Sequence, residues 1–214
     1  MNSTNIGGSL IKYHRERLGI TQKELYQGIC VVSHLSKIEN NKVEPSPEIV
    51  EELFKKLGIK YYNDAEFLDR NQEKIDRFFH NLNFYRKTNH IFKEIEEHGD
   101  NFLNSPLIID YLLLEAYSCR SKTNIERLSE LEIYMNNFQE GWFYLLKAKF
   151  ISNGEENVIR EWIMKSHGLL RNSFSLLTLM EFELGRGNFN KVIELGPEII
   201  NLGLIEGNAM AIAN

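Results

Sequence analysis

The sequence has few of the features that mark secreted or membrane proteins. Its only two cysteines, Cys30 and Cys119, lie far apart and form no CxxC pair, so we expect two buried free thiols and no disulfide framework. No apolar run approaches the ~20 residues that cross a bilayer, and the chain does not open with a basic segment followed by an apolar one. These absences predict a cytoplasmic protein that does not enter a membrane.

Patterns that mark enzymes and metal sites are also missing. The six histidines form no HExxH or other metal-binding spacing, and Cys30 with His34 would offer too few ligands for zinc. The turn at 185–188, GRGN, lacks the Lys-Ser/Thr of a phosphate-binding loop. No nucleophile has a base beside it. We therefore expect no catalytic residue, no metal and no cofactor.

Charge is distributed unevenly along the chain. Residues 1–60 carry nine basic and seven acidic side chains, a net +2, whereas the rest carries 16 basic and 23 acidic, a net −7. A mildly basic head on an acidic body fits a small DNA-binding module joined to a part that does not touch DNA.

The head reads as four short helices followed by a fifth near residues 64–70. Ile6, Leu10, Ile11 and Leu18 mark the first helix, and Ile49 to Leu57 repeat with helical spacing in the fourth. Thr21 with Glu24 predicts a capping box at the start of the second helix. Ser46-Pro47-Glu48 predicts the start of the fourth helix, and Gly58 predicts its end.

Residues 21–46, TQKELYQGICVVSHLSKIENNKVEPS, have the form of a helix-turn-helix. A capped helix and a tight turn precede a second helix, in which Leu35 and Ile38 face inward. Valines suit thymine methyl groups, serine and lysine suit base edges, and the turn after the second helix suits phosphates. The candidate DNA-binding residues are Gln22, Val31, Val32, Ser33, His34, Lys37, Asn40 and Lys42. The alternative is a small helical domain that binds protein.

The run ICVVSHLSKIENN resembles the Cro/repressor-type helix-turn-helix, especially that of PlcR-like and Rgg-like regulators in the RRNPP group of peptide-sensing, quorum-sensing proteins. The resemblance covers residues 6–60 by motif and 72–214 by architecture. It implies that Arg15 pairs with Glu39. Asn41 replaces the usual glycine after Glu-Asn, but it still tolerates a left-handed turn. The repeat domain is also shorter than is usual in that group.

After residue 71 the sequence repeats weakly every 32 residues. Ala116, Ala148 and Met180 are equivalent, with a weaker copy around Phe84. A turn follows each of the three clear copies, at 120–124, 152–156 and 185–188, and then another amphipathic helix. Spacing of this length predicts stacked helix pairs, and the third copy is closest to the tetratricopeptide pattern. An irregular helical bundle is the alternative.

The resemblance also implies a concave groove in which asparagine side chains hold a peptide backbone. Asn208 occupies such a position, although it equally fits a helix N-cap after Gly207. Tyr144 and Lys147 are further candidates for this groove, with core packing and solvation as their alternatives. Because 208–214 read as half of a helix pair, we expect the repeat domain to be incomplete there.

Together these patterns predict an all-α chain, with a helix-turn-helix DNA-binding domain at 1–70 and an α-solenoid of tetratricopeptide-like helix pairs at 71–214. The expected function is a homodimeric transcription regulator whose partners are a double-stranded DNA operator and a short signalling peptide. A ligand-independent dimeric repressor of the phage or antitoxin type, and a repeat scaffold that binds a partner protein, are the alternatives.

Overall fold

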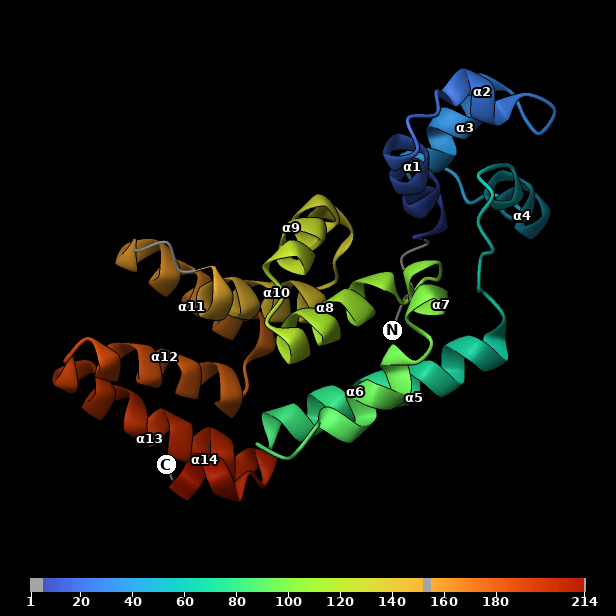
Figure 1. Ribbon diagram of the computed structural model, residues 1–214. Helices are drawn as coiled ribbons and strands as arrows, with labels where there is room; N and C mark the ends of the chain where they lie inside the picture. Colours follow the sequence, from blue (N-terminus) through green and yellow to red (C-terminus); the bar gives the residue numbers. More distant parts are fainter. Residues whose placement is uncertain (1–5, 152–154, 214) are drawn as a thin grey trace. The chain divides into compact units, whose positions relative to one another are not determined.

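The computed structural model describes residues 6–151 and 155–213, and every regular element in these ranges is a helix (Figure 1). The predicted all-α class is confirmed. The chain divides into two compact units. The N-terminal unit comprises Met1–Arg70 and His98–Ile108, and the repeat unit comprises Asn71–Glu97 and Ile109–Asn214.

The N-terminal unit contains four helices of the head and a short helix from later in the chain. They are α1 (Gly7–Arg17), α2 (Gln22–Tyr26), α3 (Val32–Glu39), α4 (Pro47–Lys56) and α7 (Gly99–Leu103). Its core is apolar, and Leu10, Leu35, Ile38 and Leu53 have no exposed surface. Leu18 was expected on the buried side of the first helix, but it is 53% exposed because α1 ends at Arg17.

Local signals place the ends of these helices. The Thr21 hydroxyl accepts a hydrogen bond from the Glu24 amide, and the Glu24 carboxylate accepts one from the Thr21 amide, so the predicted capping box is present. Ser46 is the N-cap of α4 with Pro47 at its first position, as predicted. Gly58 follows the C-cap Leu57 with a φ of +73°, a left-handed conformation that stops the helix.

The fifth helix differs from its prediction. It was expected to span about residues 64–70, but α5 runs from Ala65 to Asn83. The boundary expected between residues 70 and 71 therefore falls inside a helix. In addition, 98–108 group with the N-terminal unit, although the sequence assigned them to the repeat domain. The division into 1–70 and 71–214 stays a prediction.

Successive helices pack on one another in the repeat unit. α10 packs on α11, α11 on α12, α12 on α13 and α13 on α14. The predicted equivalent positions Ala116, Ala148 and Met180 lie in the first helices of three successive pairs, α8, α10 and α12. Residues 152–154 of the predicted turn lie outside the described residues. The helices are α6 (Asn89–Glu96), α8 (Ile108–Cys119), α9 (Lys122–Glu130), the 3₁₀ helix η1 (Glu132–Tyr134), α10 (Asn137–Phe150), α11 (Glu156–Leu170), α12 (Ser173–Gly185), α13 (Phe189–Glu206) and α14 (Ala209–Ala213).

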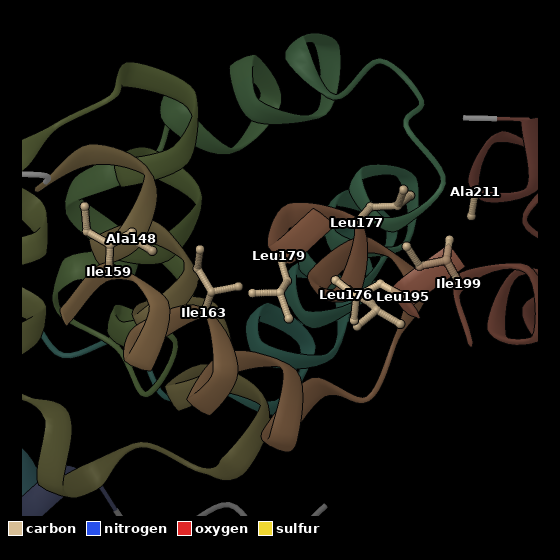
Figure 2. Packing of buried hydrophobic residues seen from close by; sticks show 9 residues of the cluster. All are labelled: Ala148, Ile159, Ile163, Leu176, Leu177, Leu179, Leu195, Ile199 and Ala211. Atoms are coloured by element: carbon tan, nitrogen blue, oxygen red, sulfur yellow. The ribbon is translucent and has the colours of Figure 1, made fainter. Parts of the chain in front are cut away.

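One apolar cluster runs through the last helices of this unit (Figure 2). Small and branched aliphatic side chains from α10 to α14 fill it, and Trp162 and Phe182 pack against its edge. Because each helix buries its apolar side against the next, the cluster continues from pair to pair as in other helical repeats. Its members are Ala148, Ile159, Ile163, Leu176, Leu177, Leu179, Leu195, Ile199 and Ala211.

Candidate functional site

A close approach of two backbones fixes α3 against α1. A β-carbon built on Gly8 in α1 would lie 2.0 Å from the carbonyl oxygen of Ile38 in α3, so only glycine fits there. Next to this point the Asn41 amide donates to the Ser9 hydroxyl at 2.6 Å, and Asn41 has a left-handed φ of 53°. Sequence reasoning missed Gly8, since nothing in the local pattern distinguishes a close approach from an ordinary helix start.

A buried ion pair holds the end of α3. Arg15 Nε donates to Glu39 Oε1 at 2.6 Å, and Arg15 Nη2 donates to Glu39 Oε2 at 2.9 Å. The Glu39 side chain is 1% exposed and that of Arg15 is 11% exposed. Hydrogen bonding to Glu39 raises the pKa of Arg15 against the opposing effect of burial. The structure thus brings together the two residues that the family resemblance paired.

Gln22 joins the same cluster. Its side-chain amide donates to Glu39 Oε2 at 2.7 Å, which ties α2 to the end of α3. The sequence placed Gln22 among the candidate DNA-binding residues, but its amide nitrogen is engaged inside the domain. The side chain therefore orients the two helices of the motif.

The first turn of α3 presents apolar and small polar side chains to solvent. Val31 is 66% and Val32 is 47% exposed, and Ser33 and Lys37 are also exposed. His34 is half-buried beside them. Exposed valines are costly on an isolated surface, whereas the floor of the major groove offers them thymine methyl groups. This outward side of α3, residues 31–34 and 37, is here called the recognition face.

The turn after α3 contributes a second group of polar side chains. The Asn40 amide donates to the carbonyl of Ser36 at 2.7 Å, closing the end of the helix, and Lys42 is exposed. A lysine at this place can meet a phosphate while the recognition face meets base edges. The helix α3 is thus held rigidly against the rest of the head, and an exposed lysine follows its end.

The head matches a known family. Residues 11–62 match the family model described as Helix-turn-helix. The N-terminal unit carries a helix-turn-helix DNA-binding domain. No curated protein sequence matches the chain.

Among solved structures, the chain is similar to PlcR of Bacillus thuringiensis in complex with the peptide PapR7 and DNA. The identity is 19% and the TM-score 0.45, over 96% of this chain and 82% of PlcR.

Downstream of the helix-turn-helix domain, Asn208 is buried in the repeat unit at 1% exposure. Its amide nitrogen donates to the Asn83 carbonyl at 2.8 Å and to the Ser173 hydroxyl at 2.9 Å. Its side-chain oxygen Oδ1 accepts from the Ala211 backbone amide at 3.4 Å. Of the two interpretations of Asn208, this geometry is that of a helix cap, extended to fasten α14 to α12 and to the end of α5.

Tyr144 and Lys147 lie on the side of α10 that packs against α11. The Tyr144 ring is 9% exposed with the ammonium of Lys165 4.0 Å from its centre, and its hydroxyl donates to Glu132. The Lys147 ammonium lies 4.7 Å from the centre of the Trp162 ring. Both residues therefore join neighbouring helices, apart from the surroundings of Asn208.

A different set of residues comes from α10, from α12 and from the turn after α5. Lys149 Nζ lies 3.9 Å from Glu181 Oε2 and 5.6 Å from the centre of the Phe174 ring, whose centre lies 5.1 Å from that of Tyr85. Burial lowers the pKa of Lys149, with Glu181 opposing it. Burial raises the pKa of Tyr85, and the nearby charge of Glu181 adds to this effect. The ammonium thus has the exposed carboxylate of Glu181 as a partner, and the Phe174 ring beside it.

The 32-residue period of the sequence relates three of these residues, Tyr85, Lys149 and Glu181, to one another. Tyr85, Tyr117, Lys149 and Glu181 each follow directly after one of the four residues that mark the 32-residue spacing. The sequence predicted the period, but it did not predict that the residues next to the repeating positions lie together. The period shows which residues are equivalent, whereas only the packing shows which of them meet.

Among the described residues, no group of three or more His, Cys, Asp or Glu side chains is placed to hold a metal ion. No helix in that part of the chain is long and apolar enough to span a membrane. Both cysteines are free thiols, but the expectation that they are buried was wrong. Cys30 is half-buried and Cys119, the last residue of α8, is exposed.

Proposed function

We propose that this protein is a sequence-specific transcription regulator that binds operator DNA as a homodimer and responds to a short signalling peptide. The observation that carries the DNA-binding proposal is the recognition face. Its side chains point outward from a helix that Gly8 and the Arg15–Glu39 pair hold in place. A helix held this firmly loses little entropy when it enters a groove.

Each residue has a role in this proposal. Val31 and Val32 contact thymine methyl groups, while Ser33, His34 and Lys37 reach base edges, with Lys37 at a guanine. Lys42 and Asn40 contact the phosphate backbone beyond the end of α3. Gln22 acts through Glu39 and positions the helices, since its amide is already engaged there.

We place the peptide-binding site around Lys149, and not at Asn208, Tyr144 and Lys147. Asn208 and Tyr144 are buried and already bonded within the fold. The Lys149 side chain is 29% exposed, and its partner Glu181 is 60% exposed. A peptide that ends in a free carboxylate can replace Glu181 as the partner of this ammonium, and the ring of Tyr85, which is 37% exposed, is available to the side chains of the peptide.

Selection from a pool of random DNA duplexes tests the DNA-binding proposal. We expect repeated rounds with the full chain to enrich one duplex sequence, with two related half-sites if a dimer binds. A variant with Val32 and Ser33 both changed to Asp should enrich nothing, because its recognition face would repel DNA. Enrichment of no sequence by the unaltered chain would instead favour a repeat scaffold that binds a partner protein.

The peptide proposal is tested with a pool of random heptapeptides that carry a free carboxyl end. We expect this pool to raise the melting temperature of the chain, and the same pool with amidated ends to have little effect. Lys149→Met should remove the response, while Lys147→Met, on the α11 side of the same helix, should keep it. No response of the unaltered chain, with DNA selection intact, would favour the ligand-independent repressor.

A further inference from the structure

One face of α13 exposes a stripe of large apolar side chains. Phe189 is 63%, Ile193 is 73%, Ile200 is 46% and Leu204 is 64% exposed. At 100° per residue these four positions fall within one arc of about 60°, whose centre lies about 130° around the helix from the mean direction of Leu195 and Ile199, which α13 buries in the core of the repeat unit. Figure 1 shows α12 lying along one side of α13.

The spacing of these four side chains is the same in both directions along the helix, although the outer two residues differ. Phe189 and Leu204 lie equally far from the bond between Gly196 and Pro197, and so do Ile193 and Ile200. In two antiparallel copies of a helix related by a twofold axis, positions that lie equally far from the axis on either side come together, and each such contact occurs twice. The symmetric spacing therefore pairs apolar side chains with apolar side chains. If the axis passes through the middle of α13, Ile193 meets the partner's Ile200 and Phe189 meets the partner's Leu204.

The centre of the stripe allows two helices to approach closely. Gly196 faces open space, since a β-carbon built on it would meet no atom within 4 Å. Glycine in a helix interior costs about 1 kcal/mol relative to alanine, and this structure offers no contact within the chain that requires it here. A second helix that crosses at this point would use the missing side chain.

The apolar area of the stripe is about what one partner contributes to a stable interface between two proteins. Its four side chains and Pro197 expose on the order of 500 Å² of apolar surface, from the areas usual for such side chains. Interfaces between identical chains are about 65% apolar, so this area corresponds to a contact of roughly 800 Å² on each partner, the usual size of a specific complex. The largest apolar patch on a typical monomer has about this size, on the order of 300–600 Å², and such a patch is often functional.

We propose that this stripe is the contact between two copies of the chain, which pack α13 against α13 in antiparallel orientation. The inference rests on the homodimer in the proposed function and names the surface that forms it. The recognition face, the Lys149 surroundings and the stripe involve different residues, so each can be altered without changing the others.

Sedimentation equilibrium of the full chain is the first measurement, and we expect a dimer. Gly196→Leu should raise the dimer dissociation constant by about tenfold or more, because a side chain at the crossing separates the helices. The monomer tolerates this change, as there is open space around Gly196. Ile205→Lys is the matched control, since Ile205 is 73% exposed on α13 but lies about 100° from Leu204, and this variant should remain dimeric.

A mixing experiment tests the pairing itself. Ile193→Lys and Ile200→Glu should each be monomeric alone, because each buries two unpaired charges in its own dimer. Mixed in equal amounts they should form a heterodimer, in which one lysine meets one glutamate and the other contact is the original isoleucine pair. Heterodimers from this mixture would establish the antiparallel register.

A monomeric wild-type chain, or a dimer unaffected by Gly196→Leu and Ile193→Lys, would overturn the assignment of this surface. If a longer form of the chain covers the stripe with its own next helix, it will sediment as a monomer, which also overturns it. DNA selection distinguishes this failure from that of the proposed function. A chain that dimerises through α13 but enriches no duplex keeps the interface and loses the function.

Discussion

Arg15, in the last turn of α1, and Glu39, the last residue of α3, form a two-bonded ion pair in which the Glu39 carboxylate is almost fully buried. Removing one charge leaves the other uncompensated in a place that water hardly reaches. We expect Glu39→Ala to lower the free energy of unfolding by about 3–5 kcal/mol, as measured by urea denaturation. A double-mutant cycle with Arg15→Ala should show strong coupling. Additive effects of the two changes would contradict the pair.

Glu16 provides the control for this pair. Its carboxylate lies 3.3 Å from Arg15 Nη2 but is 56% exposed. An exposed pair contributes at most about 1 kcal/mol, so Glu16→Ala should change stability little. A loss as large as that of Glu39→Ala would mean that proximity to Arg15, and not burial, determines the effect.

Gly8 gives a second prediction for the head. In Gly8→Ala the new methyl group would lie 2.0 Å from the Ile38 carbonyl oxygen, so α1 and α3 must separate. We expect a loss of about 3 kcal/mol or more in unfolding free energy, together with weaker DNA binding. In Gly168→Ala, in α11, the new methyl group would meet no atom within 4 Å outside its own helix backbone, so this variant should instead be more stable by about 0.5–1 kcal/mol. Equal stability of the two variants would rule out the close approach.

Local chemistry explains which parts of this structure the sequence predicts. The Thr21–Glu24 capping box and the Ser46-Pro47 helix start depend on residues within one turn, so both were predicted. Gly8 depends on packing against residues far away in the chain, and no local pattern records it. The length of α5 is different, because Phe67, Ile75, Phe78 and Leu82 continue the helical spacing of apolar residues beyond residue 70. Asn208 shows the same limit, because an asparagine after a glycine suits a ligand contact and a helix cap equally until its neighbours are known.

Asn208 should stabilise the repeat unit without taking part in peptide binding. Asn208→Ala leaves the Asn83 carbonyl and the Ser173 hydroxyl without this donor, at a cost of about 1–3 kcal/mol. Thermal unfolding should show this loss, whereas Asn201→Ala, at an exposed position on α13, should have almost no effect. Unchanged stability of Asn208→Ala with weaker peptide binding would return this residue to the ligand site.

Asp110 gives the repeat unit a specific pH dependence. Burial raises its pKa to about 6, although Gln139 donates a hydrogen bond to it at 2.9 Å and so opposes the shift. Between pH 4 and 6 the folded chain keeps a proton that the unfolded chain releases, so stability falls as pH rises through this range, by about 3 kcal/mol for this group. Asp110→Asn should therefore be more stable than wild type at pH 7, with the difference shrinking toward pH 4.

Urea denaturation at several pH values measures this effect. Asp100→Asn, at an exposed position in α7, is the control and should follow the wild-type pH curve. An Asp110→Asn variant whose curve also parallels that of the wild type would show that folding does not raise the pKa of Asp110.

The affinity of the selected duplex for Lys37→Ala and Lys42→Ala tests DNA reading by α3 most directly. Lys37→Ala should weaken binding by roughly 1–3 kcal/mol and relax the base preference at one position of each half-site. Lys42→Ala should weaken all duplexes alike and reduce the salt dependence of binding by about one phosphate contact. Wild-type affinity and base preference in both Lys37→Ala and Ser33→Ala would remove α3 from the groove and contradict the account.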